Sequence, residues 1–147
     1  MIEYVKTRGG QVLATVISSG ISENGINFVT NNNSEHQVGI LQWPQGHIIE
    51  AHIHNTLSRT VNSTQEVLFV RWGRVRVDLY TSDRTYECSR ILEAGDVVFL
   101  ESGGHGFEIL EEAQIIEVKQ GPYIGEHEKT KFVPLDNPHL KDTHAEH

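Results

Sequence analysis

Residues 66–80 read EVLFVRWGRVRVDLY, and this stretch decides which fold class the sequence predicts. β-Branched and aromatic residues fill both halves, with Gly73 between them. Such a composition favours extended strands, and no 3.6-residue apolar period suggests a helix. We therefore predict strands over 66–72 and 74–80. Both faces of the first are apolar, which fits a central strand or a strand that packs on a partner subunit.

The same pattern continues on both sides of this stretch. Short β-rich runs separated by turn residues every 8–12 positions are typical of a β-sandwich or small barrel. A chain of 147 residues and 16.6 kDa fits one domain with a real core. The further predicted strands are 12–17, 38–43, 47–54, 86–92, 96–100, 106–110 and 114–120.

Composition excludes several classes of partner. The net charge of −8 disfavours nucleic acid and anionic membranes, which reward clustered Lys and Arg. No apolar run approaches the roughly 20 residues that cross a bilayer, and the first residues do not resemble a signal peptide. The lone Cys88 forms no internal disulfide and is expected to be a buried structural residue. These features predict a cytoplasmic protein.

Four residues stand out as candidates for a site. In a strand over 47–54, His52 and His54 share a face, so that their imidazoles can bind one metal ion, whereas His47 faces the other way. Glu66 is a charged residue at the head of an apolar strand and needs a partner or exposure. His105 follows a glycine turn and precedes another predicted strand.

These residues resemble the motifs of the cupin superfamily over roughly residues 38–120. Five residues separate Gly46 from His52, and six separate Glu66 from Gly73, as in the first cupin motif. Residues 55–65 are longer than the usual gap and are expected to form a loop at the barrel mouth. In the second motif, Glu101 replaces a common proline and His105 comes one residue early.

The resemblance implies a double-stranded β-helix, the jelly-roll barrel of cupins. It also implies one divalent metal ion per chain, held by His52, His54, Glu66 and His105. On this division residues 1–37 add strands to a barrel formed by 38–133. Residues 134–147 form a poorly ordered tail that contains His139, His144 and His147.

Three imidazoles and one carboxylate suit Fe, Mn, Ni, Co or Zn and leave a position open for a substrate. The leading expectation is a metal-dependent enzyme, isomerase-like or oxygenase-like, that acts on a small polar substrate such as a sugar derivative. The cupins that the chain resembles most are often linked with surface-polysaccharide metabolism.

Two other functions stay open. One is a metal-containing binding or sensory module for a sugar or an acid, and the other is a metal-free barrel that serves dimerisation. The apolar strand 66–72 and the N-terminal strands predict a homodimer. Arg71, Arg74 and Arg76 form a solvated hairpin face or a site for an anionic ligand.

Overall fold

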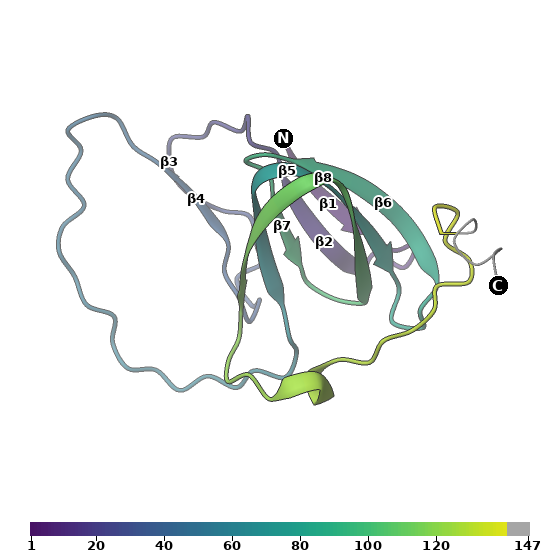
Figure 1. Ribbon diagram of the computed structural model, residues 1–147. Helices are drawn as coiled ribbons and strands as arrows, with labels where there is room; N and C mark the ends of the chain where they lie inside the picture. Colours follow the sequence, from purple (N-terminus) through teal and green to yellow (C-terminus); the bar gives the residue numbers. More distant parts are fainter. Residues whose placement is uncertain (141–147) are drawn as a thin grey trace.

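A computed structural model describes residues 1–140 of the chain (Figure 1). These residues are almost wholly β, as predicted, with one short 3₁₀ helix, η1 (Gly125–Glu128). None of the described residues belongs to a helix with the length and apolar character of a membrane span. The strands are β1 (Ile2–Lys6), β2 (Val12–Ile17), β3 (Gly25–Phe28), β4 (Gly39–Gln42), β5 (Glu66–Tyr80), β6 (Tyr86–Glu93), β7 (Val97–Leu100) and β8 (Gly104–Lys119).

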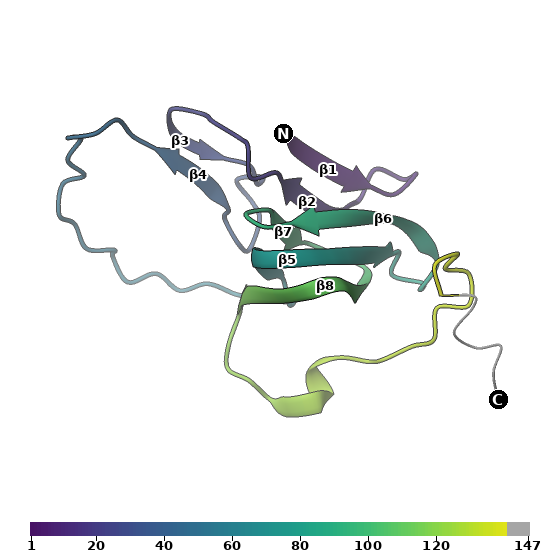
Figure 2. The same ribbon diagram turned by 45° about the horizontal axis from the view of Figure 1, so that its top comes forward.

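One antiparallel sheet curls into a half-barrel. Its strand order is β1-β2-β7-β5-β6, and β8 pairs with the opposite edge of β5 (Figures 1 and 2). The strands β3 and β4 form a separate hairpin to one side. The described residues thus form an open, curled sheet, and the predicted all-β class is confirmed at this level.

The strands β5 and β8 form one long ribbon that bends on itself. The sequence suggested separate strands on each side of Gly73, and the structure instead continues both β5 and β8 through the bend. The register shifts between Trp72 and Arg74, as expected where a bulge sharpens the twist. Gly73 has φ +90°, and a Cβ there would lie 2.2 Å from the carbonyl oxygen of Glu112. Only glycine lets the two backbones approach so closely.

The core fills the concave side of the curl. Leu68 and Val70 come from the first half of β5, and Val77 and Leu79 from the second half. The other members of this buried cluster come from β1, β2, β6 and β7: Val5, Leu13, Ala14, Val16, Leu92, Val98 and Leu100. Cys88 of β6 and Ile115 of β8 are partly buried against them. Cys88 was expected to be buried, and the structure packs it against the core with partial exposure.

The convex side is covered over only part of its width. Val29 is buried beside β1, where its carbonyl oxygen accepts a hydrogen bond from Tyr4 Oη at 3.0 Å. The ring of His36 lies 6.3 Å from that of Phe99, which is fully buried. Over β5 and β8 the convex face stays open, and Phe69, Ile116 and Val118 are exposed there.

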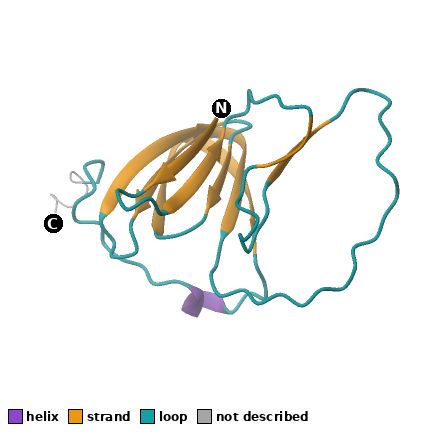
Figure 3. Ribbon diagram, turned by 180° about the vertical axis from the view of Figure 1, so that it is seen from behind, coloured by secondary structure: helices purple, strands orange, loops and turns teal. Residues whose placement is uncertain are grey.

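Residues 43–65, here called the arm, connect β4 to β5 and lead away from the half-barrel (Figures 1 and 3). The strand expected over 47–54 is not formed in the single chain, because no other strand lies beside it. Residues 55–65 form no strand, as expected, but they belong to the arm that leads away from the half-barrel and not to a loop at its mouth. The predicted strands over 12–17, 38–43, 86–92 and 96–100 match β2, β4, β6 and β7 within one residue at each end.

The described part of the predicted tail packs against the sheet. Asn137 is fully buried, and its Nδ2 donates a hydrogen bond to Tyr80 Oη at 2.7 Å. The ring of His139 lies 6.3 Å from that of Tyr86. The remaining tail residues, 141–147, which include His144 and His147, lie outside the described part of the chain.

Gly73→Ala should destabilise the fold by about 3 kcal/mol or more, because positive φ costs about 1–2 kcal/mol and the new methyl also meets backbone. Gly10→Ala is the matched control, since Gly10 has φ +87° and open space around its Cβ position. Gly10→Ala should therefore lose only the stability that a positive φ costs. Urea unfolding of both variants measures the two losses. Equal losses in both variants would show that the contact at Glu112 carries no cost.

Candidate functional site

Glu66 and His105 meet at the open end of the bent ribbon. They begin β5 and β8, which run antiparallel, so that Glu66 pairs with Lys119 and His105 pairs with Leu79 at the opposite end. The bend returns one end of the ribbon to the other, and His105 Nε2 lies 3.1 Å from Glu66 Oε2. Both side chains are part-buried, at 33% and 19% exposed. The need for a partner at Glu66, expected from the sequence, is met by His105.

The electrostatic setting favours an ionised Glu66. The hydrogen bond from His105 lowers the pKa of Glu66, against the opposing effect of burial, and the charges of His105, Lys119 and Lys129 lower it further. A carboxylate in this state is an acceptor for a proton donor and a ligand for a cation.

The pair opens into a cleft of about 930 Å³, a size in the range typical of small-molecule sites. One side is the end of the β5–β8 ribbon, and the other is the segment after β8, which carries η1 and crosses below the half-barrel in Figure 1. The ionisable residues that line it are Glu66, Asp78, Tyr80, His105, Glu108, Glu117, Lys119, Tyr123, Glu126, Glu128, Lys129 and Lys131.

Lys119 holds the two sides of this cleft together. Its Nζ lies 3.6 Å from Glu117 Oε1 on the same strand and 3.5 Å from Glu128 Oε2 of η1. It also lies 5.7 Å from the centre of the Tyr123 ring. By contrast, Lys129 and Lys131 make no ion pair among the described residues. The cleft thus offers ammonium groups to an anionic or polar ligand.

His52 and His54 lie together, but on the arm. Their ring centres are 5.3 Å apart and the rings meet edge to face, with both residues exposed. His52 Nδ1 is 2.9 Å from the carbonyl oxygen of Glu50. Residues 1–140 contain no group of three or more His, Cys, Asp or Glu side chains arranged to hold a metal ion. The four candidate ligands therefore form two pairs in the single chain, Glu66 with His105 and His52 with His54.

Two other histidines, His47 and His36, lie apart from both pairs. His47 stacks on Trp43 with ring centres 4.2 Å apart. His36 packs on Phe99 and has a buried Nδ1 with no hydrogen-bond partner.

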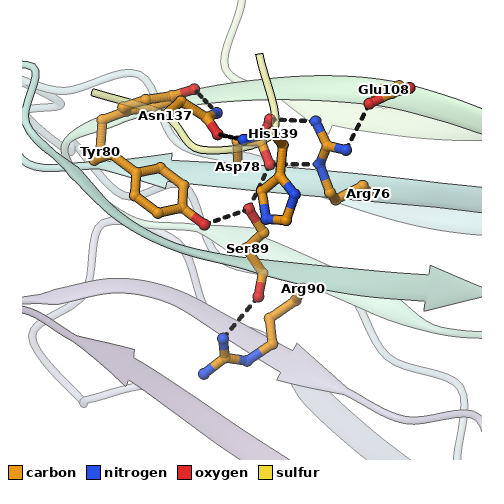
Figure 4. A network of polar contacts seen from close by, with 9 residues as sticks. Arg76, Asp78, Tyr80, Ser89, Arg90, Glu108, Asn137 and His139 are labelled. Carbon is orange, nitrogen blue, oxygen red and sulfur yellow. Dashed lines mark hydrogen bonds and ion pairs between the residues drawn. The ribbon is translucent and has the colours of Figure 1, made fainter. Parts of the chain in front are cut away.

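The sequence did not predict a buried polar network that forms part of the cleft wall (Figure 4). Arg76 and Asp78 are 8% and 2% exposed, and Arg76 donates from Nε and Nη2 to the two Asp78 oxygens at 2.8 and 3.1 Å. Ser89 Oγ donates to Asp78 at 2.5 Å, and Arg76 Nη1 lies 2.6 Å from Glu108. Burial raises the pKa of Asp78, but hydrogen bonds from Arg76, Ser89 and Asn137 outweigh it and leave the pKa lowered. The alternation of polar and apolar residues over 74–80 was the available signal.

The three arginines of the predicted basic face therefore have partners. Arg76 is a buried structural residue, Arg74 Nε lies 3.4 Å from Glu93, and Arg71 Nη1 donates to Gln114 at 3.1 Å. Arg71 and Arg74 are solvent-exposed at the bend.

The same network anchors the C-terminal segment that completes the cleft. Asn137 bonds to Tyr80, and Asp136 Oδ2 accepts a hydrogen bond from the Tyr86 backbone N–H at 2.8 Å. The ring of Phe132 meets that of Tyr80 edge to face at 5.2 Å. Residues 129–131 are thereby held between this anchor and the Lys119–Glu128 contact.

Asp78→Ala should cost about 3–5 kcal/mol, because it leaves the buried Arg76 without its bidentate partner. Glu93→Ala removes the exposed pair with Arg74 and should cost under about 1 kcal/mol. Urea unfolding of both variants measures the difference. A loss at Asp78 no larger than that at Glu93 would contradict a structural role for the network.

Asp78→Ala should also change how the free energy of unfolding depends on pH in the acid range. Because the pKa of Asp78 is lowered on folding, its contribution is present above the ordinary carboxyl pKa and is lost as the pH falls through the lowered folded value. As the pH falls from about 5 to the point of acid unfolding, the Asp78→Ala variant should therefore lose less stability than the wild type loses. Parallel curves of unfolding free energy against pH would contradict this assignment.

Comparison of the chain with protein-family models, curated proteins and solved structures finds no match, so its function has to be inferred from its own residues.

Proposed function

We propose that the protein binds one divalent metal ion per chain through His52, His54, Glu66 and His105, in a barrel completed to a double-stranded β-helix. The observation that carries the proposal is the Glu66–His105 pair, which sits part-buried at a cleft of small-molecule size. The spacings of Gly46 to His52 and of Glu66 to Gly73 resemble the first cupin motif, with a longer gap between His54 and Glu66. The combined set of imidazole and carboxylate donors suits a transition metal.

Completion of the site requires the His52–His54 pair to reach the Glu66–His105 pair. His105 lies near the start of β8, whose second edge has no strand beside it in the described part of the chain. A strand over 47–54 that pairs with this edge would place His52 and His54 on one face, as the period of two requires. With that face turned toward the cleft, all four side chains would converge.

The cleft residues indicate what the bound ligand is like. Lys129 and Lys131 line the cleft and offer cationic donors to a ligand, while Glu66 and His105 are reserved for the metal ion. A bound metal ion would supply Lewis-acid or, for iron, oxygen chemistry. We infer a metal-dependent enzyme, isomerase-like or oxygenase-like, for a small polar substrate such as an acidic sugar derivative.

A second candidate is a metal-containing binding or sensory module for a sugar or an acid. It is favoured by the pairing of most carboxylates that line the cleft, which leaves few of them to act as a general base. Glu66 bonds to His105, Glu117 and Glu128 lie beside Lys119, and Asp78 and Glu108 pair with Arg76. Glu126 is the lining carboxylate that makes no ion pair in the described part of the chain. Turnover of a panel of sugar phosphates, uronic acids and keto acids would distinguish the enzyme from the module, which binds without turnover.

The metal proposal is tested by elemental analysis of protein purified without nickel affinity. Wild type should hold about one ion per chain, and His52→Ala, His54→Ala and His105→Ala should each lose most of it, since each removes one donor of four. Glu66→Gln should weaken binding because the amide lacks the balancing charge. His47→Ala is the matched control on the same arm and should keep its metal.

Wild-type protein that is free of metal and takes up no Mn, Fe, Ni or Zn would refute the proposal. A His105→Ala variant that keeps full occupancy would remove His105 from the ligand set. Circular dichroism of every variant separates loss of a ligand from loss of the fold.

A further inference from the structure

We propose that the arm of one chain docks on the free edge of β8 in a second copy of the chain, which gives a homodimer. Each metal site of this dimer then combines His52 and His54 of one chain with Glu66 and His105 of the other. This inference rests on the proposed function for its metal site, but the docking itself stands on separate observations.

The first observation is the free edge of β8. This strand has 16 residues and pairs with β5 alone in the described part of the chain. In register, Phe107 lies beside Val77 and Ile109 beside Val75, so that they share the face of those fully buried valines. Nevertheless Phe107 and Ile109 are 36% and 53% exposed. The apolar layer therefore ends at an uncovered strand edge, which natural proteins rarely leave open.

The second observation is the arm itself. Ile48 and Ile53 are 82% and 90% exposed, and Leu57 and Val61 are exposed as well. No backbone N–H of residues 48–61 makes a hydrogen bond in the described part of the chain. A segment with these apolar side chains and an extended, unpaired backbone can add as a strand to the free edge of a sheet.

The arm is fixed at both ends rather than folded onto its own barrel. At one end His47 stacks on Trp43, and its backbone N–H donates to the Pro44 carbonyl oxygen at 3.2 Å. At the other end the Glu35 carboxylate accepts hydrogen bonds from the backbone N–H groups of Asn62 and Ser63 at 3.0 and 3.2 Å. Figures 1 and 3 show the chain between these points leading away from the half-barrel.

The exposed area of the chain indicates how much surface a partner would cover. The chain exposes 10628 Å², whereas a compact monomer of 16.6 kDa exposes about 7,600 Å². The excess of about 3,000 Å² per chain, or about 6,000 Å² for two chains, is as large as the area that the largest obligate dimer interfaces bury in total, about 5,000 Å² or more. A small ligand in the cleft would leave most of this surface uncovered.

The exposed β3–β4 hairpin favours docking of the arm on a second copy over docking on the barrel of its own chain. The side chains of Ile26, Phe28 and Leu41 on β3 and β4 are also more than half exposed. Docking of the arm on its own β8 would leave this hairpin face bare. A two-fold dimer makes the exchange reciprocal, so that the projecting hairpin and arm of each chain are both covered by the other.

The test uses two double variants that lack opposite halves of the site. His52→Ala/His54→Ala lacks the arm ligands, and Glu66→Gln/His105→Ala lacks the cleft ligands, so neither should hold zinc alone. Unfolded together and refolded at equal concentration, they should form mixed dimers for half of the population. Each mixed dimer has one complete site, which predicts about one zinc ion per four chains, or a quarter of the wild-type occupancy. No recovery of zinc in the mixture, with wild type fully loaded, would overturn the exchange.

A second measurement does not depend on metal. Light scattering of the wild type at micromolar concentration should give twice 16.6 kDa, and replacement of residues 48–61 by a short Gly/Ser linker should give a monomer. A wild-type mass of 16.6 kDa, or a dimer that persists without residues 48–61, would overturn the docking. A metal-free wild type that is dimeric only with its arm would refute the metal proposal and still support the docking.

Discussion

The bend of the β5–β8 ribbon at Gly73 is the constraint on which the rest of the structure depends. Without a Cβ at this position, two backbones approach to a distance that any other residue would block. The bend folds the two halves of β5 onto one core, in which Leu68 and Val70 pack with Val77 and Leu79. It also brings together the first residue of β5 and a residue near the start of β8, Glu66 and His105, which the register places at opposite ends of the ribbon.

The buried polar network gives the cleft its second side. Arg76 and Asp78 alternate along β5 with the core residues Val77 and Leu79, and they face the segment that follows β8 rather than the core. Their charges are stable there because each is matched by a partner and by hydroxyl and amide donors. Through Tyr80 and Asn137 the network holds the C-terminal segment, and with it Lys129 and Lys131, which line the same cleft as Glu66 and His105.

The proposed dimer would explain two features together: the open edge of the half-barrel and the separation of the four proposed metal ligands into two pairs. In the described part of the chain, β8 has one edge without a strand beside it, and the proposed metal site needs two ligands besides the Glu66–His105 pair. The arm carries apolar residues without cover and two histidines without a third ligand beside them. In this proposal, one strand supplied by a second copy meets both needs, so the hydrophobic gain of docking the arm would also position the metal ligands.

Local composition determined much of the fold. Runs rich in Val, Ile, Phe and Tyr are extended whatever lies beside them, so β2, β6 and β7 could be predicted from the sequence to within one residue. The need for a partner at Glu66 could also be predicted, because a charge at the head of an apolar strand is costly alone. Long-range packing decided the rest: the continuity of β5 through Gly73, the burial of Asn137, and the state of residues 47–54. A strand exists only beside another strand, and the sequence of 47–54 specifies the pattern of its faces but not the edge with which it pairs.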